Sequence, residues 1–149
     1  MKDSSAGSTC NILQQLLWNY FEVSMKVRQY HWNIVWNNFI EDHRFLDEIK
    51  DNLDEHIDMV AEMIRQKDMS PDISKSVEMS KIQLQPWSVV NSASVFNDLL
   101  NDYITLCWAT NKTISTIEDT CDCQDIPANL EMILADLNKY RWFISSKTK

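Results

Sequence analysis

The stretch HWNIVWNNFIEDHRFLDEIKDNLDEHIDMVAE, residues 31–62, decides the fold of this 149-residue chain and holds all three of its histidines. From Ile40 to Gln66, apolar side chains recur every three or four residues, which is the period of an amphipathic helix with one core-facing stripe. The members of this stripe are Leu46, Ile49, Leu53, Ile57, Val60 and Ile64. The pattern predicts one long helix over residues 40–66, after a break around residues 36–38.

A second stripe on the same helix consists of metal-ligand types of side chain: His43, Asp47, Asp58 and Glu62. At about 100° per residue, these four stay within a sector of about 100° that does not overlap the apolar stripe. A solvated acidic face is one interpretation. However, Asp47 and Asp58 are about 16 Å apart along a helix, so one chain cannot bring both to the same ion.

The spacing of these residues is symmetric about a point between residues 52 and 53. If two copies of the helix pack antiparallel about a two-fold axis at that point, His43 faces Glu62 of the partner subunit. Asp47 then faces Asp58 of the partner subunit. Because an isologous contact is self-complementary, it predicts two equal sites, each with one histidine and three carboxylates from two chains.

The spacing also resembles a known signature. The pattern H-x11-H-x3-D-x10-D-x3-E resembles the ferroxidase signature of the Dps mini-ferritins, and its five members here are His31, His43, Asp47, Asp58 and Glu62. The likeness spans roughly residues 10–145. Two further blocks carry it, namely His31-Trp32-Asn33-Ile34 with Phe39, and Tyr140-Arg141-Trp142-Phe143-Ile144.

The chain departs from the family pattern in two loops. Trp36-Asn37 stands where family members usually carry Gly-Pro, and the Gly-Gly that often follows the second helix is replaced around Lys67-Asp68-Met69. Both changes affect loop geometry and leave the five ligand positions untouched.

Size and composition indicate one domain of long helices. A mass of 17.5 kDa is enough for a sizeable core, and one glycine with three prolines leaves few turns. We find no apolar run of 18 residues, and the polar start MKDSSAGST does not resemble a signal peptide, so we expect a soluble cytoplasmic protein that does not bind membranes. We expect the four cysteines to be free thiols rather than a disulfide framework.

The remaining elements follow from caps and apolar periods. Residues 1–8 are expected to form a flexible tail before a domain over 9–146, with Ser8 or Thr9 capping a first helix over 9–34. A third helix is predicted from Asn91 or Ser92 to about residue 118, and a fourth over about 127–145 with Asp125 as its cap. The apolar set of the third helix includes Ile104 and Trp108. The connection over 67–90 has room for a short helix.

Four long amphipathic helices with one long crossover between the second and third are typical of an all-α, ferritin-like four-helix bundle. A ferritin-type site inside the bundle would need Glu-x-x-His motifs, and none of the three histidines has a glutamate three residues before it. We therefore expect the metal at a subunit interface. His56 points away from the acidic stripe by helical phase, so it is left out of the predicted site.

Histidine nitrogen with carboxylate oxygen suits Fe(II), Zn(II) or Mn(II), and the residues alone do not select one. The resemblance implies iron: a ferroxidase that oxidises Fe(II) to Fe(III), preferably with hydrogen peroxide, and stores ferric mineral in a dodecameric cage built from two-fold dimers. It also makes His31 a ligand, and Trp32 a residue that catches stray oxidising equivalents. In such a cage the acidic turn over 118–125 could line three-fold pores. Within that turn, Cys121-x-Cys123 alone is a weak metal signal.

Two other functions remain open. Dps proteins often bind DNA through lysine-rich tails, so one alternative is a DNA-compacting stress-protection protein in which iron binding is secondary. Here the first 25 residues contain only Lys2, and the C-terminal tail offers Lys147 and Lys149. With a net charge of −8, we expect DNA binding to be weak or absent. The second alternative is an acidic helical assembly whose stripe binds nothing.

Overall fold

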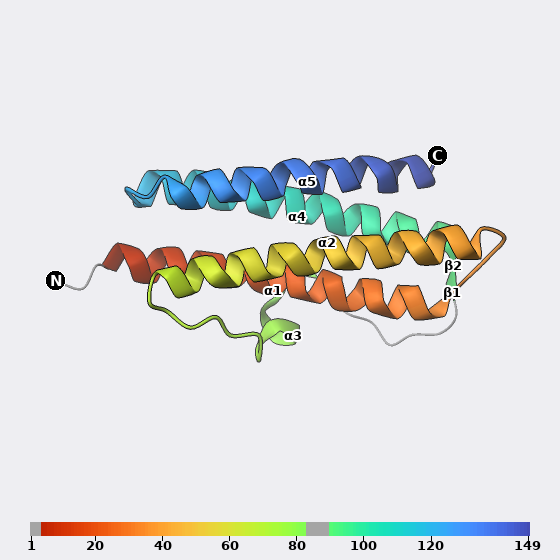
Figure 1. Cartoon of the computed structure of the whole chain (residues 1–149), viewed down its shortest axis with the longest axis horizontal. Helices are drawn as coiled ribbons and strands as arrows, with labels where there is room; N and C mark the ends of the chain where they lie inside the picture. Colours follow the sequence, from red (N-terminus) through yellow and green to blue (C-terminus); the bar gives the residue numbers. More distant parts are fainter. Residues whose placement is uncertain (1–3, 83–89) are drawn as a thin grey trace.

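The computed structural model describes residues 4–82 and 90–149, and it is built of four long helices and one short one (Figure 1). In chain order the elements are α1 (Ser4–Asn33), β1 (Ile34–Val35), α2 (Phe39–Gln66), α3 (Ser76–Met79), β2 (Val90–Asn91), α4 (Ser92–Thr120) and α5 (Asp125–Lys147). The predicted all-α four-helix bundle, with a long crossover that holds a short helix, is confirmed.

The long helices form two hairpins, α1–α2 and α4–α5, which pack mainly through α1 against α4 (Figure 1). The crossover returns the chain from the end of α2 to the opposite end of the bundle, so α2 and α4 start at the same end. There, β1 and β2 pair in parallel, with Ile34 opposite Val90 and Val35 opposite Asn91. This short pairing fixes the end of α1 beside the start of α4.

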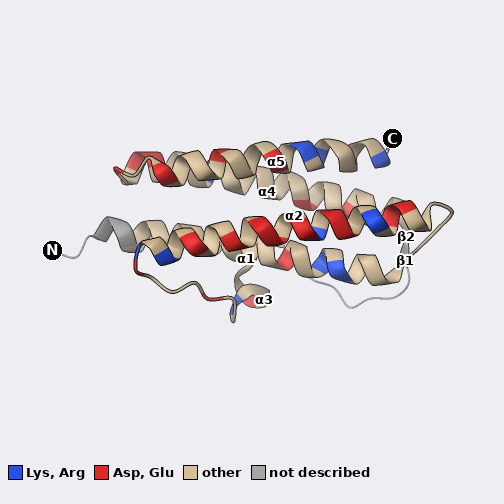
Figure 2. Cartoon of the chain, viewed as in Figure 1, with Lys and Arg blue, Asp and Glu red and all other residues tan. Residues whose placement is uncertain are grey.

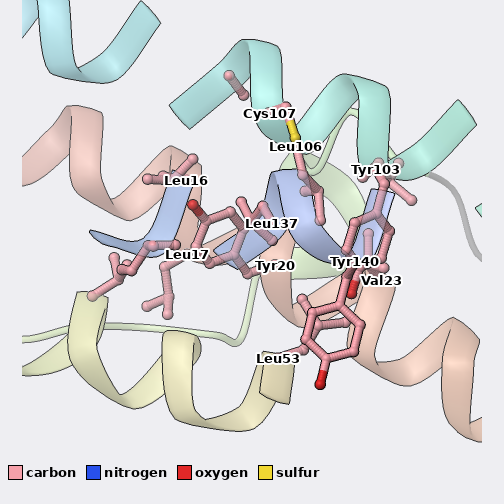
Figure 3. Packing of buried hydrophobic residues seen from close by; sticks show 14 of the residues in the cluster. Leu16, Leu17, Tyr20, Val23, Leu53, Tyr103, Leu106, Cys107, Leu137 and Tyr140 are labelled. Atoms are coloured by element: carbon pink, nitrogen blue, oxygen red, sulfur yellow. The ribbon is translucent and has the colours of Figure 1, made fainter. Parts of the chain in front are cut away.

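The core lies between the two hairpins, where all four long helices contribute side chains (Figure 3). The predicted stripe of α2 is buried, apart from Ile57, which is partly buried. Tyr20 of α1 bonds through its hydroxyl to Thr110 of α4, so even this central polar pair is satisfied. The prediction was wrong for Ile104 and Trp108, which are 44% and 52% exposed, because they lie on the flank of α4 rather than on its buried face.

Two predicted helix starts were also wrong. The first helix begins at Ser4 rather than after Ser8 or Thr9, because residues 4–8 contain no proline to stop it, and Gly7 disfavours a helix without ending it. Asp125 is the first residue of α5 rather than its cap, and the N-cap is Gln124. In the first turn the carboxylate of Asp125 still favours the helix through the helix dipole. Residues 1–3 of the predicted tail lie outside the described residues.

The start of α4 and the end of α2 follow from local chemistry. The helix α4 begins at Ser92, within the predicted start, and Asn91 caps it, since its side-chain oxygen accepts a hydrogen bond from the backbone N–H of Ser94 at 3.0 Å. After α2, Asp68 has a φ of 59°, a left-handed conformation that glycine adopts freely and that aspartate tolerates better than most residues. Asp68 thus occupies the position where the sequence departs from the Gly-Gly pattern.

Polar side chains of α1 hold the crossover against the bundle. Gln14 exchanges two hydrogen bonds with the backbone of Asp72, at 2.6 and 2.9 Å. Further along, Gln15 donates to the carbonyl of Met79 at 2.9 Å, and the side-chain oxygen of Asn19 accepts from the backbone N–H of Lys81 at 2.9 Å. The crossover is therefore fixed at both ends of α3.

The expectation of four free thiols is corrected. Cys121 and Cys123 are bonded to each other in the turn between α4 and α5, with their Cα atoms 5.3 Å apart, while Cys10 and Cys107 are free and buried. The sequence argument concerned long-range disulfide frameworks, and it did not consider a local link between cysteines two positions apart. Among the described helices, none has a stretch long and apolar enough to cross a membrane.

Candidate metal site

The hairpin between α1 and α2 brings two of the predicted ligands together. His31 lies in the last turn of α1 and His43 in the first turns of α2. Their rings stack, with centroids 3.7 Å apart and planes inclined by 19°. The contact closes a segment of only five residues between the helices, in which the backbone N–H of Phe39 bonds to the carbonyl of Trp36 at 3.1 Å.

The two histidines hold each other through their backbones. Nδ1 of His31 lies 2.9 Å from the carbonyl oxygen of His43, and Nδ1 of His43 lies 2.8 Å from the carbonyl oxygen of His31. A carbonyl only accepts hydrogen bonds, so each Nδ1 must carry a proton. In the neutral ring the lone pair is then on Nε2. This is the arrangement that orients a histidine for metal binding, with one ring nitrogen anchored and the other available.

Asp47 follows His43 by one helical turn and is ionised at neutral pH. Its Oδ1 bonds to Nζ of Lys50 at 2.8 Å, and the same ammonium group contacts Asp51 at 3.1 Å. The hydrogen bond from Lys50 lowers the pKa of Asp47, and the positive potential of His31 and His43 lowers it further. Asp47 therefore offers an anionic oxygen one helical turn from His43, and Lys50 already neutralises part of its charge.

The other two predicted ligands lie farther along α2. Asp58 and Glu62 are exposed, and neither carboxylate has a hydrogen bond or ion pair within residues 4–82 and 90–149. Since α2 is one uninterrupted helix, they are roughly 16 and 22 Å beyond Asp47. Acidic side chains recur along this helix (Figure 2). In the described part of one chain, no group of three His, Cys, Asp or Glu side chains could hold a metal ion.

Large apolar side chains surround the histidine pair. Trp32 is 70% exposed, and Trp36 and Phe39 at the same turn are also exposed. Phe39 contacts the ring of His43, with centroids 5.1 Å apart. One chain thus presents an incomplete ligand set beside an uncovered apolar surface. The assembly of all five ligands from two chains remains a prediction.

Comparison with known proteins identifies the family. Residues 10–147 match the family model of the ferritin-like domain. The chain belongs to the ferritin-like family. The DNA protection during starvation protein of Brevibacillus brevis is 24% identical over 148 residues, which cover 98% of both proteins.

Solved structures agree with this assignment. The Dps protein of Bacillus brevis superposes with a TM-score of 0.91 at 22% identity over the full length of both chains. The DPS protein of Vibrio cholerae O1, described as a member of the ferritin-like diiron-carboxylate proteins, has a TM-score of 0.91 at 25% identity over 98% of this chain and 92% of that one. The predicted membership of the Dps mini-ferritins is confirmed.

This mini-ferritin also has a positioning residue that the sequence analysis missed. Asp42 precedes His43 and is buried, and it accepts hydrogen bonds from Ser92 at 2.6 Å and from Lys147 at 2.7 Å. These contacts tie the start of α2 to the start of α4 and the end of α5, beside the histidine pair. From the sequence alone, Asp42 looked like an ordinary acidic residue in a first helical turn.

The third histidine of the mini-ferritin lies outside the site, in agreement with its helical phase. His56 is buried, with Nε2 2.8 Å from Asp136 of α5. Burial lowers the pKa of His56, and the nearby carboxylate of Asp136 opposes that shift. His56 therefore links α2 to α5 within the bundle.

Proposed function

We propose that this mini-ferritin is a cytoplasmic iron-storage and detoxification protein. It oxidises Fe(II), preferably with hydrogen peroxide, at sites shared by two subunits, and it stores the ferric product in a dodecameric cage. The ligands are His31, His43 and Asp47 of one subunit, with Asp58 and Glu62 of the partner subunit. The observation that carries the proposal is the histidine pair, with each Nδ1 anchored on a backbone carbonyl and each Nε2 available, one helical turn from the ionised Asp47.

The ligand types fit the proposed reaction. Imidazole nitrogen and carboxylate oxygen bind Fe(II), and anionic carboxylates compensate the added positive charge of Fe(III), which favours the oxidised state. Two Fe(II) ions supply the two electrons that reduce one hydrogen peroxide. With two protons, the reduced peroxide forms two water molecules. Because both electrons are delivered together, no hydroxyl radical is released.

Trp32 has a protective role in this proposal. Its indole is exposed in the single chain and directly follows His31. An indole can give up one electron, so Trp32 would intercept an oxidising equivalent that escapes from a site holding only one iron. The apolar surface that Trp32 shares with Trp36 and Phe39 suits burial against a second subunit.

DNA compaction is the alternative function, and the names of the curated relatives refer to DNA protection. A net charge of −8 opposes binding to a polyanion, and acidic side chains run along α2 (Figure 2). Consumption of Fe(II) and peroxide would itself protect DNA, because it removes both reagents that generate hydroxyl radical. The iron function therefore accounts for protection without a DNA complex.

Fe(II) oxidation kinetics test the proposal. With the wild-type protein, Fe(II) should be oxidised faster by peroxide than by air, and a particle near twelve subunits should gain a dense iron core. Glu62→Gln should reduce the rate at least tenfold. Glu55→Gln is the matched control, since Glu55 is an exposed glutamate of α2 outside the ligand set, and it should leave the rate unchanged. The ferroxidase proposal is wrong if Fe(II) oxidation in the presence of the wild-type protein matches the protein-free rate with both oxidants.

A further inference from the structure

A second site lies on the bundle away from the histidine pair. A cavity of about 700 Å³ opens between the first half of α1 and the second half of α4, and Lys81 of the crossover contributes to its lining. Its nearest approach to the histidine pair along α1 is Asn19, roughly 18 Å from His31 by helical rise. The volume is in the range of cavities that bind small molecules. The proposed iron chemistry uses none of its lining residues.

The charge of this cavity is opposite to that of the protein. Among the described residues, its lining contains Lys81 and Lys112 and no aspartate or glutamate, although the chain has 22 acidic residues. Neither ammonium group forms an ion pair within the described residues. Instead, Nζ of Lys81 and Nζ of Lys112 lie 5.0 and 4.8 Å from the ring centroid of Trp108.

Trp108 supplies a flat apolar surface between two cavities. Its indole is 52% exposed in the middle of α4. A second cavity of about 410 Å³, between α4 and α5, also has Trp108 in its lining, and its described lining residues add Arg141 and no carboxylate. Cation–π contacts at an exposed indole are weak, so an anionic ligand can draw the lysine side chains away from the ring face.

Hydrogen bonds between the crossover and α1 also fix the backbone around the cavity. The backbone N–H of Lys81 bonds to Asn19, and the hydroxyl of Ser80 bonds to the same side-chain oxygen. Lys112 is one helical turn after Trp108 on α4. The two lysines thus start from fixed backbone positions in the crossover and on α4, so only their side chains need to be ordered when a ligand binds.

We propose that this cavity binds a nucleoside phosphate of mononucleotide size. The phosphate lies between the ammonium groups of Lys81 and Lys112, which suit a compact dianion because each is a point charge with three donors. The base stacks on the indole of Trp108, and Ile12, Leu16 and Ala109 provide the apolar floor. Both elements are needed: the lysines alone would favour any anion, and the indole alone would favour any planar ring.

Isothermal titration of the assembled protein tests the site, with adenosine 5′-monophosphate, adenosine and inorganic phosphate as probes. The monophosphate should bind at least tenfold more tightly than either component. Lys81→Gln with Lys112→Gln keeps the apolar stems and should weaken the monophosphate at least tenfold. Lys75→Ala with Lys149→Ala removes the same charge outside the cavity lining and should leave the affinity unchanged. Trp108→Leu should weaken the monophosphate more than it weakens inorganic phosphate.

Three results would overturn the proposal. The first is that the monophosphate does not bind at millimolar concentration. The second is that the two double-lysine variants lose affinity equally. The third is that a single-stranded oligonucleotide binds and the mononucleotide does not. The last result would make Trp108 a nucleic-acid contact. None of the substituted residues belongs to the proposed iron site, so Fe(II) oxidation should be unchanged in every variant, and the two proposals can fail independently.

Discussion

Complementation between two inactive variants tests the shared site directly. One variant carries His43→Ala with Asp47→Ala, and the other carries Asp58→Ala with Glu62→Ala. Along the single helix α2, His43 and Glu62 are roughly 28 Å apart, so one chain cannot join the two halves. Each variant alone should therefore form dimers with two incomplete sites and should be nearly inactive.

The two-fold arrangement sets the size of the rescue. In a mixed dimer, one site receives both lesions and the other receives none. Every mixed dimer should therefore have about half of the wild-type activity. If pairing is random, about half of the dimers are mixed, and the whole preparation should recover about a quarter of the wild-type rate.

The assay is Fe(II) oxidation by peroxide, measured on co-expressed variants with different affinity tags. The recovery of about a quarter is expected before selection; purification on both tags in sequence then removes particles that hold only one variant, so the recovery should not fall below that value. The matched control is co-expression of the first variant with His31→Ala, because both lesions then lie in the same half of the site and no intact site can form. The restored activity should keep the wild-type preference for peroxide over air. If the tagged mixture is no more active than either parent, the five ligands are not shared across this two-fold axis.

Three other outcomes follow from the same contacts. Because burial lowers the pKa of His56, the unfolded chain binds the proton more readily, and stability should fall by up to about 1.4 kcal/mol per pH unit below about pH 6.5. In urea unfolding, His56→Gln should reduce this dependence of the unfolding free energy on pH. An unchanged pH dependence would refute the role given to His56. Asp42→Asn should cost about 1–3 kcal/mol of unfolding free energy through its bonds to Lys147 and Ser92, whereas the exposed control Lys149→Ala should cost almost nothing. In gel-shift assays at about 0.15 M salt, linear duplex DNA should not be retained, and a persistent shift would restore the DNA-binding alternative.

The sequence predicted what depends on period and spacing. The apolar repeat of α2 is independent of its neighbours, so burial of Leu46, Leu53 and Val60 could be predicted from the 3.6-residue period alone. The approach of His31 to His43 was also anticipated, through the resemblance to the Dps signature. Helix starts were less predictable, since the possible cap at Ser8 does not prevent a helix from beginning upstream.

Contacts between remote segments could not be predicted. Asp42 bonds to residues 50 and 105 positions away, and no local pattern marks such pairs. The reciprocal bonds of the histidines depend on how two helix ends meet across a tight turn. By contrast, the contact of Lys50 with Asp47 is an ordinary i,i+3 helix pair, which the spacing could have indicated. The two lysines beside Trp108 come from the crossover and α4, so only the fold brings them together.

A site divided between chains also links iron to assembly. In one subunit Asp47 is engaged by Lys50, while Asp58 and Glu62 face solvent. Antiparallel contact of two α2 helices brings carboxylates of both chains together, and like charges oppose that contact in the absence of a cation. On the proposed arrangement Fe(II) binds the dimer and not the free subunit. It therefore stabilises the contact by about 2.7 kcal/mol per site at a concentration a hundred times its Kd, or about 5.4 kcal/mol for the two sites of one dimer. If the proposed arrangement holds, the acidity of α2 weakens assembly in the absence of iron and strengthens it when iron is bound.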